Sequence, residues 1–137
     1  MKNIFVVLFM IFTGLTFGQN NDVKSPKIAI KIPLGEAITL KNHVIKFTEV
    51  LEDSRCPENM TCVWAGRARV LLEISENGKK SINKTLIFGK VNKGESDDKE
   101  LFSYNNSKVN GLSLSPYPNS KEAVEGAPYI LLVYLEN

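Results

Sequence analysis

The two cysteines and the only tryptophan of this 137-residue chain lie in one short stretch, DSRCPENMTCVWAG, at residues 53–66. Two thiols this close together could form a disulfide, a redox-active pair or part of a zinc site. Thioredoxin-like redox pairs have the spacing C-x-x-C at the start of a helix, which this pair lacks. Zinc needs four ligands, and Cys56, Cys62 and the single histidine, His43, do not complete that set. We therefore predict no metal site, and the use of the two thiols depends on the compartment.

The first residues, MKNIFVVLFMIFTGLTFGQN, have the pattern of a secretory signal peptide. Lys2 is followed by an apolar run over residues 4–12, and Thr16 and Gly18 are small residues suitably placed for cleavage before Gln19. Crossing a membrane takes about 20 apolar residues, and this run is shorter. We expect cleavage between Gly18 and Gln19 and no stable membrane span in the mature chain.

The predicted cleavage divides the chain into a signal peptide at residues 1–18 and a single β-domain at residues 19–137. No cysteine lies near the expected cleavage site, so we expect a soluble periplasmic or secreted protein rather than a lipid-anchored one. Without Lys2 the mature chain carries 16 basic and 15 acidic side chains. This balance gives no electrostatic argument for binding nucleic acid or an anionic membrane, and we expect neither as a partner.

In an exported protein, an even number of cysteines is most simply explained by a disulfide. Pro57, Glu58 and Asn59 favour a tight turn between Cys56 and Cys62. Such a turn brings the two Cα atoms into the range of roughly 4.4 to 6.8 Å that a bridge requires. We predict a Cys56–Cys62 disulfide that acts as a structural staple.

The apolar residues repeat mostly with a period of two, which is typical of half-buried strands. Asn77-Gly78 is a strong hairpin signal, because both residues tolerate positive φ. We expect residues 89–110 to form a long polar loop with at most one edge strand. YILLVYL at 129–135 is either a central strand covered on both faces or a turn of buried helix, and its β-branched and aromatic residues favour the strand. The sequence predicts an all-β fold, a small antiparallel β-sandwich or partly open barrel of seven to eight strands. The expected strands are 27–32, 36–40, 43–51, 68–74, 81–88, 112–115 and 129–135.

The residues around the cysteines have both structural and binding interpretations. Unbroken alternation places Trp64 on the same face as Ala68 and predicts a core anchor that packs on the disulfide, with ligand stacking as the alternative. A bulge at Gly66 would reverse that facing. Asp53, Ser54 and Arg55 precede the bridge, where a local Asp–Arg pair or an Asx turn explains them. Asp53, Ser54, Arg55 and Trp64 together form a candidate binding or structural loop.

The motifs EDSRCP at 52–57 and CVWAG at 62–66, followed by an alternating strand, resemble those of a group of small, uncharacterised exported bacterial β-proteins and lipoproteins. The resemblance covers mainly residues 34–74, and a weaker similarity is found in LSLSPYP at 112–118. It implies export, a small β-domain and the cysteine pair, and it supplies no catalytic residue.

Catalytic motifs are not evident: there is no G-x-S-x-G elbow, P-loop or dinucleotide-binding glycine pattern. We therefore predict no catalytic residue and no cofactor. We expect a monomeric, non-catalytic exported domain that binds a protein or a cell-envelope glycan through its loops. The alternatives are a small secreted hydrolase that uses the carboxylates of Glu49, Glu52 and Asp53, and a secreted inhibitor of a hydrolase.

Overall fold

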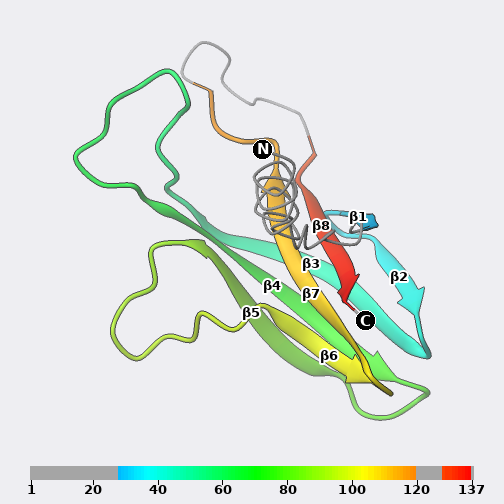
Figure 1. The fold of residues 1–137 in the computed structure, drawn as a ribbon. Coiled ribbons are helices and arrows are strands. Elements are labelled where there is room, and N and C mark those ends of the chain that lie inside the picture. Colours follow the sequence, from blue (N-terminus) through cyan, green and yellow to red (C-terminus); the bar gives the residue numbers. More distant parts are fainter. Residues whose placement is uncertain (1–27, 120–127, 137) are drawn as a thin grey trace, which may run out of the picture.

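The computed structural model describes residues 28–119 and 128–136, and the expected signal peptide with its cleavage site at Gly18 and Gln19 lies outside them. The described residues form eight strands in two four-stranded antiparallel sheets (Figure 1). No helix long and apolar enough to cross a membrane occurs in this part of the chain. The prediction of an all-β, sandwich-like fold is confirmed.

The first sheet combines strands that are distant in sequence, whereas the second consists of four consecutive strands. The first sheet has the order β1 (Ala29–Pro33), β8 (Ile130–Glu136), β7 (Ser107–Ser115) and β6 (Glu100–Tyr104). The second has the order β2 (Ala37–Leu40), β3 (His43–Asp53), β4 (Arg67–Glu76) and β5 (Ile82–Gly89). The chain therefore enters the first sheet, builds the whole second sheet, and then returns to complete the first.

The core lies between the two sheets and follows from the alternation. On β4, the even-numbered residues from Ala68 to Ile74 are buried and the residues between them are partly exposed, as the period of two predicts. β8 lies between β1 and β7, so its predicted central position is confirmed. Its burial is one-sided, however: Leu131 and Val133 are buried, whereas Leu132 is only half-buried. The fully enclosed side chains are Ile32, Ile45, Phe47, Ala68, Val70, Leu72, Leu86, Val109, Leu131 and Val133.

The turns correct one part of the sequence interpretation. Asn77 and Gly78 have φ values of 37° and 74°, as the hairpin signal predicts. A second hairpin joins β6 to β7, with Asn105 at φ 52°. The expectation that residues up to 110 are irregular apart from one edge strand was therefore wrong, because β7 begins at Ser107. Asn105-Asn106 lacks the glycine that marks the first hairpin, so the turn was not identified.

Two irregularities in β3 decide where its last residues point. Its register against β4 shifts between Phe47 and Glu49 and again between Val50 and Glu52. Each such bulge changes the alternation of side chains along the strand. As a result, Asp53 pairs with the buried Ala68 and faces inward, while Glu52 pairs with Arg69 and faces outward.

Two Leu→Ala substitutions test the placement of the core. Leu72 is fully enclosed and Leu112 is 43% exposed. Leu72→Ala should lower the free energy of unfolding by about 2–5 kcal/mol, because it removes apolar contacts and leaves a cavity. Leu112→Ala should change it by no more than about 0.5 kcal/mol. Urea unfolding followed by circular dichroism measures both, and equal losses would contradict this assignment of the core.

Candidate functional site

The segment between β3 and β4, residues 54–66, forms a projecting loop that we call the disulfide loop (Figure 1). Its two ends are paired: the Ser54 N–H donates to the Arg67 carbonyl at 2.8 Å, and the Cys56 N–H donates to the Ala65 carbonyl at 3.2 Å. Cys56 and Cys62 are disulfide-bonded with their Cα atoms 5.9 Å apart, which confirms the predicted bridge. The loop is thus closed at its base by the backbone and again by the disulfide.

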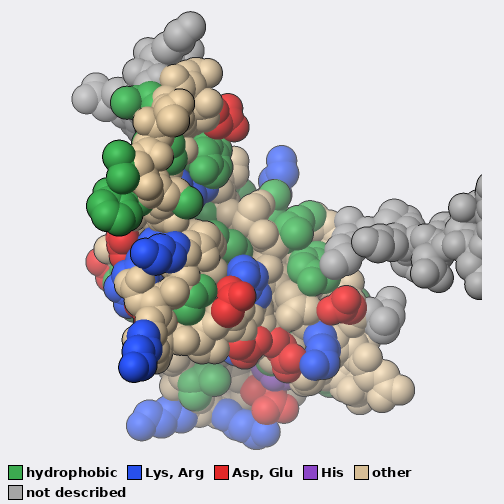
Figure 2. All heavy atoms as spheres, turned by 60° about the vertical axis from the view of Figure 1, so that its left-hand side comes forward, with side chains coloured by type: hydrophobic (Ala, Val, Ile, Leu, Met, Phe, Trp, Pro, Cys, Tyr) green, Lys and Arg blue, Asp and Glu red, His purple; other side chains and the backbone are tan. Residues whose placement is uncertain are grey.

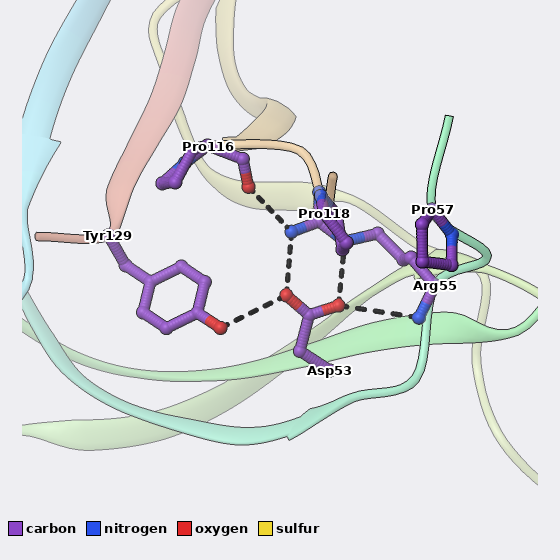
Figure 3. A pocket seen from close by; sticks show the side chains of 6 residues that line it. All are labelled: Asp53, Arg55, Pro57, Pro116, Pro118 and Tyr129. Atoms are coloured by element: carbon purple, nitrogen blue, oxygen red, sulfur yellow. Dashed lines mark hydrogen bonds and ion pairs between the residues drawn. The ribbon is translucent and has the colours of Figure 1, made fainter. Parts of the chain in front are cut away.

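The Arg55 side chain fixes the loop to the other sheet (Figure 3). Its Nη1 donates to the Leu114 carbonyl at 2.7 Å, and its Nη2 donates to the Pro116 carbonyl at 2.9 Å. Both carbonyls lie at the end of β7 or just beyond it. Because Arg55 lies two residues after the end of β3 in the second sheet, one guanidinium connects the two layers of the sandwich.

Asp53 neutralises this buried guanidinium through a bidentate ion pair. Arg55 Nε lies 2.8 Å from Asp53 Oδ1, and Arg55 Nη2 lies 2.7 Å from Asp53 Oδ2. The exposed fractions of the two side chains are only 6% and 10%. The local Asp–Arg pair is therefore confirmed, and its bidentate geometry is among the stronger forms of ion pairing.

Tyr129 completes this cluster from the residue before β8. Its hydroxyl donates to Asp53 Oδ2 at 3.1 Å. Burial raises the pKa of Asp53, but the hydrogen bonds and the charge of Arg55 outweigh it, so the pKa is lowered overall. Burial, followed by the charge of Asp53, raises the pKa of Tyr129. A hollow of about 310 Å³ adjoins the cluster and is lined by Asp53, Arg55, Pro57, Pro116, Pro118 and Tyr129.

The outer face of the second sheet carries a separate charged cluster. Arg67 Nε lies 3.0 Å from Glu52 Oε2, and Arg67 also pairs with Glu95. The Ser54 hydroxyl donates to Glu52 Oε1 at 3.0 Å. The hydrogen bond from Arg67, followed by that from Ser54, lowers the pKa of Glu52. Glu52 and Asp53 are thus both held as ionised partners of arginines.

The hydrolase alternative requires carboxylates that converge in one pocket. Glu52 and Asp53 are neighbours in β3, but they face opposite sides of the sheet, and each is engaged by a different arginine. Glu49 is exposed on the same strand. The structure therefore does not bring the two adjacent carboxylates into one pocket.

Trp64 lies where the sequence interpretation did not place it. It is 73% exposed, so the prediction of a core anchor that packs on the disulfide was wrong. The reason is Gly66, which has φ +67° and interrupts the alternation before β4 begins at Arg67. A Cβ at this position would lie 1.8 Å from the Ser54 carbonyl oxygen, so only glycine allows the two ends of the loop to approach so closely.

The disulfide loop instead presents apolar side chains to solvent. Val63 is 87% exposed and Met60 is 56% exposed, in addition to Trp64. Figure 2 shows hydrophobic side chains gathered on the upper part of the molecule, at the height where the loop projects in Figure 1. Exposed apolar groups that are grouped in this way are typical of interaction sites.

A shallow hollow of about 150 Å³ lies beside Trp64 on the outer face of the second sheet. Five of its seven lining residues have polar or charged side chains, although the surface they expose to the hollow is more apolar than polar. The Lys90 N–H donates to the Gly66 carbonyl at 3.3 Å, which brings the start of the loop after β5 next to the disulfide loop. The lining residues are Glu52, Ser54, Trp64, Gly66, Arg67, Lys90 and Asn92.

His43, the remaining candidate ligand from the sequence, lies away from the disulfide loop, at the start of β3. Its ring stacks on Phe102 with the centroids 3.9 Å apart, and its Nδ1 lies 3.0 Å from the Lys41 carbonyl. Within residues 28–119 and 128–136, no three His, Cys, Asp or Glu side chains are grouped in a way that could hold a metal ion. His43 is thus engaged in packing at a strand end.

Comparisons of the chain with protein-family models, curated proteins and solved structures find no match. The geometry of the site is therefore the basis on which its function can be inferred.

Replacing Asp53 with Asn tests the buried ion pair. Asp53→Asn leaves the Arg55 charge buried without its counter-ion and should lower the free energy of unfolding by about 3 kcal/mol at pH 7. Because the pKa of Asp53 is lowered in the folded state, the contribution of the pair is complete above the unfolded pKa of about 3.9 and is lost as pH falls through the folded pKa. The difference from wild type should therefore shrink at low pH.

Glu76→Gln is the matched control, because it breaks a more exposed ion pair with Lys79. It should cost less than about 1 kcal/mol. Chemical unfolding at several pH values measures both variants. A loss for Asp53→Asn no larger than that for Glu76→Gln would contradict the role given to the buried pair.

Replacing both Cys56 and Cys62 with serine tests the staple. The double variant should lose about 2 kcal/mol of unfolding free energy, since the bridge restricts a short loop in the unfolded chain. Thermal unfolding of this variant, and of reduced wild-type protein, should show similar losses. If unreduced, unfolded wild-type protein purified from an oxidising compartment has two titratable thiols, the staple is refuted.

Proposed function

We propose that this protein is an exported, non-catalytic binding domain that contacts its partner through the disulfide loop. The observation that carries the proposal is Trp64, which is 73% exposed at the end of a loop closed by a disulfide. Tryptophan is among the residues most enriched at binding hot spots, since it buries a large area on contact.

The construction of the loop supports this role. Cys56 and Ala65 are joined by a backbone hydrogen bond, and the neighbouring Arg55 is anchored to two carbonyls of the other sheet. Such restraints reduce the conformational entropy that a loop loses when it binds. A loop whose position is fixed in advance can therefore use more of the contact energy of Trp64 and Val63 for affinity.

Export is part of the proposal. The Cys56–Cys62 bridge is consistent with an oxidising compartment outside the cytoplasm. Together with the leader and the expected cleavage before Gln19, it favours a periplasmic or secreted protein. The partner in that compartment is a protein or an envelope glycan, and an inhibitor of a hydrolase would be a special case of the first kind.

Capture of envelope components with immobilised protein tests the proposal. Trp64→Ala should reduce the captured partner at least tenfold, because it removes the central contact. Ile82→Ala is the matched control: Ile82 is an exposed apolar residue, 60% accessible, at the opposite end of β5 from Gly89. Ile82→Ala should capture as much as wild type. Equal capture by Trp64→Ala and wild type would contradict the proposal, provided that both variants have the wild-type circular dichroism spectrum.

A further inference from the structure

We infer that the hollow beside Trp64 binds a negatively charged sugar residue of a glycan, with Trp64 as the stacking platform and Lys90 as the partner of the anionic group. This inference rests on the proposed function and narrows the partner to one chemical class.

The size and shape of the hollow favour a single ring. Its volume is about 150 Å³, and it is open and shallow. Sites for drug-sized ligands usually occupy about 300–1,000 Å³. The flat face of a sugar ring presents several C–H groups, and their partial positive charge suits the negative face of an indole. Trp64 is exposed and is one of the residues that line the hollow, so its indole is accessible to such a ring.

The lining combines apolar surface with several polar groups, and a sugar ring needs both. Protein hot spots usually lie in well-packed pockets that exclude water. Glu52, Ser54, Arg67 and Asn92 instead line the hollow with donors and acceptors. Sugar hydroxyls both donate and accept, so they can extend hydrogen-bond networks such as the one that links Ser54, Glu52 and Arg67.

The charge balance favours an anionic ring. Arg67 is neutralised by ion pairs with Glu52 and Glu95, and Arg69 lies 3.9 Å from both of these carboxylates. The cluster holds two carboxylates and two guanidinium groups before Lys90 is added. Lys90 is exposed and belongs to none of the ion pairs found in residues 28–119 and 128–136. Its flexible ammonium can therefore pair with a carboxylate or sulfate on the sugar.

Trp64 is the only tryptophan in the chain, so its fluorescence reports on this hollow alone. The probes are polygalacturonate, alginate, hyaluronan and dextran sulfate, titrated at 0.15 M salt. Dextran and galactan supply rings without charge, and polyglutamate supplies carboxylates without rings. We expect at least one anionic polysaccharide to change the Trp64 emission with saturation, and neither the neutral polymers nor polyglutamate to do so.

Two matched variants test the assignment of residues. Lys90→Gln should weaken that binding about tenfold, as expected for loss of a charge-assisted contact. Lys31→Gln, which removes an exposed cation from β1 in the other sheet, should change it less than about twofold. Calorimetry with Trp64→Ala should show at least a tenfold loss for the same polysaccharide.

Several results would overturn the inference: no response to any anionic polysaccharide, an equal response to neutral polymers or polyglutamate, or unchanged binding by Lys90→Gln. If Trp64-dependent capture yields a protein while no polysaccharide changes the Trp64 emission, the inference fails and the proposed binding function stands. If capture does not depend on Trp64, the proposed function fails as well.

Discussion

The fold and the candidate site both depend on the burial of one positive charge, the guanidinium of Arg55. Taking such a charge out of water is costly unless its hydrogen-bond donors are satisfied. Asp53 supplies the counter-charge, and the Leu114 and Pro116 carbonyls supply the remaining acceptors from the opposite sheet. Since these partners come from both layers of the sandwich, the guanidinium is satisfied only when the end of β3 and the end of β7 are correctly placed. This requirement positions the disulfide loop, together with the hydrogen bond from the Glu58 N–H to the Pro118 carbonyl at 3.2 Å.

The bulges in β3 turn two adjacent carboxylates to opposite faces of the sheet, where they have different partners. Asp53 faces inward and stabilises the anchor of the loop, whereas Glu52 faces outward and organises Arg67 beside the exposed indole. The inner cluster is therefore structural, and the outer cluster borders the hollow that we propose as the glycan site. Gly66 affects both the base of the disulfide loop and the exposed indole. Its positive φ lets the loop close tightly and turns Trp64 away from the core.

The sequence predicted most of the fold because local patterns determine it. Alternation identified the core strands, Asn77-Gly78 identified a hairpin, and the cysteine spacing identified the disulfide. The site was predicted only in part. The Asp53–Arg55 pair is local and was one of the two interpretations offered for these residues. Its carbonyl partners are 59 and 61 residues away from Arg55 in sequence, and no pattern connects them. Trp64 was misplaced because alternation was extended through Gly66, where a close backbone approach overrides it.

The central claim is that Arg55 holds the disulfide loop, and with it Trp64, in a fixed position. Amide hydrogen exchange by NMR at Cys56 tests this claim directly, since its N–H donates to the Ala65 carbonyl at the base of the loop. Arg55→Lys keeps the charge but cannot reproduce the forked contacts with Asp53 and the two carbonyls. We expect the protection of the Cys56 amide against exchange to fall at least tenfold in Arg55→Lys. The protection of the Val70 and Leu72 amides in β4 should not change once any difference in global stability between the variant and wild type is subtracted. Unchanged protection at Cys56 would show that the loop is held without Arg55 and would contradict the account.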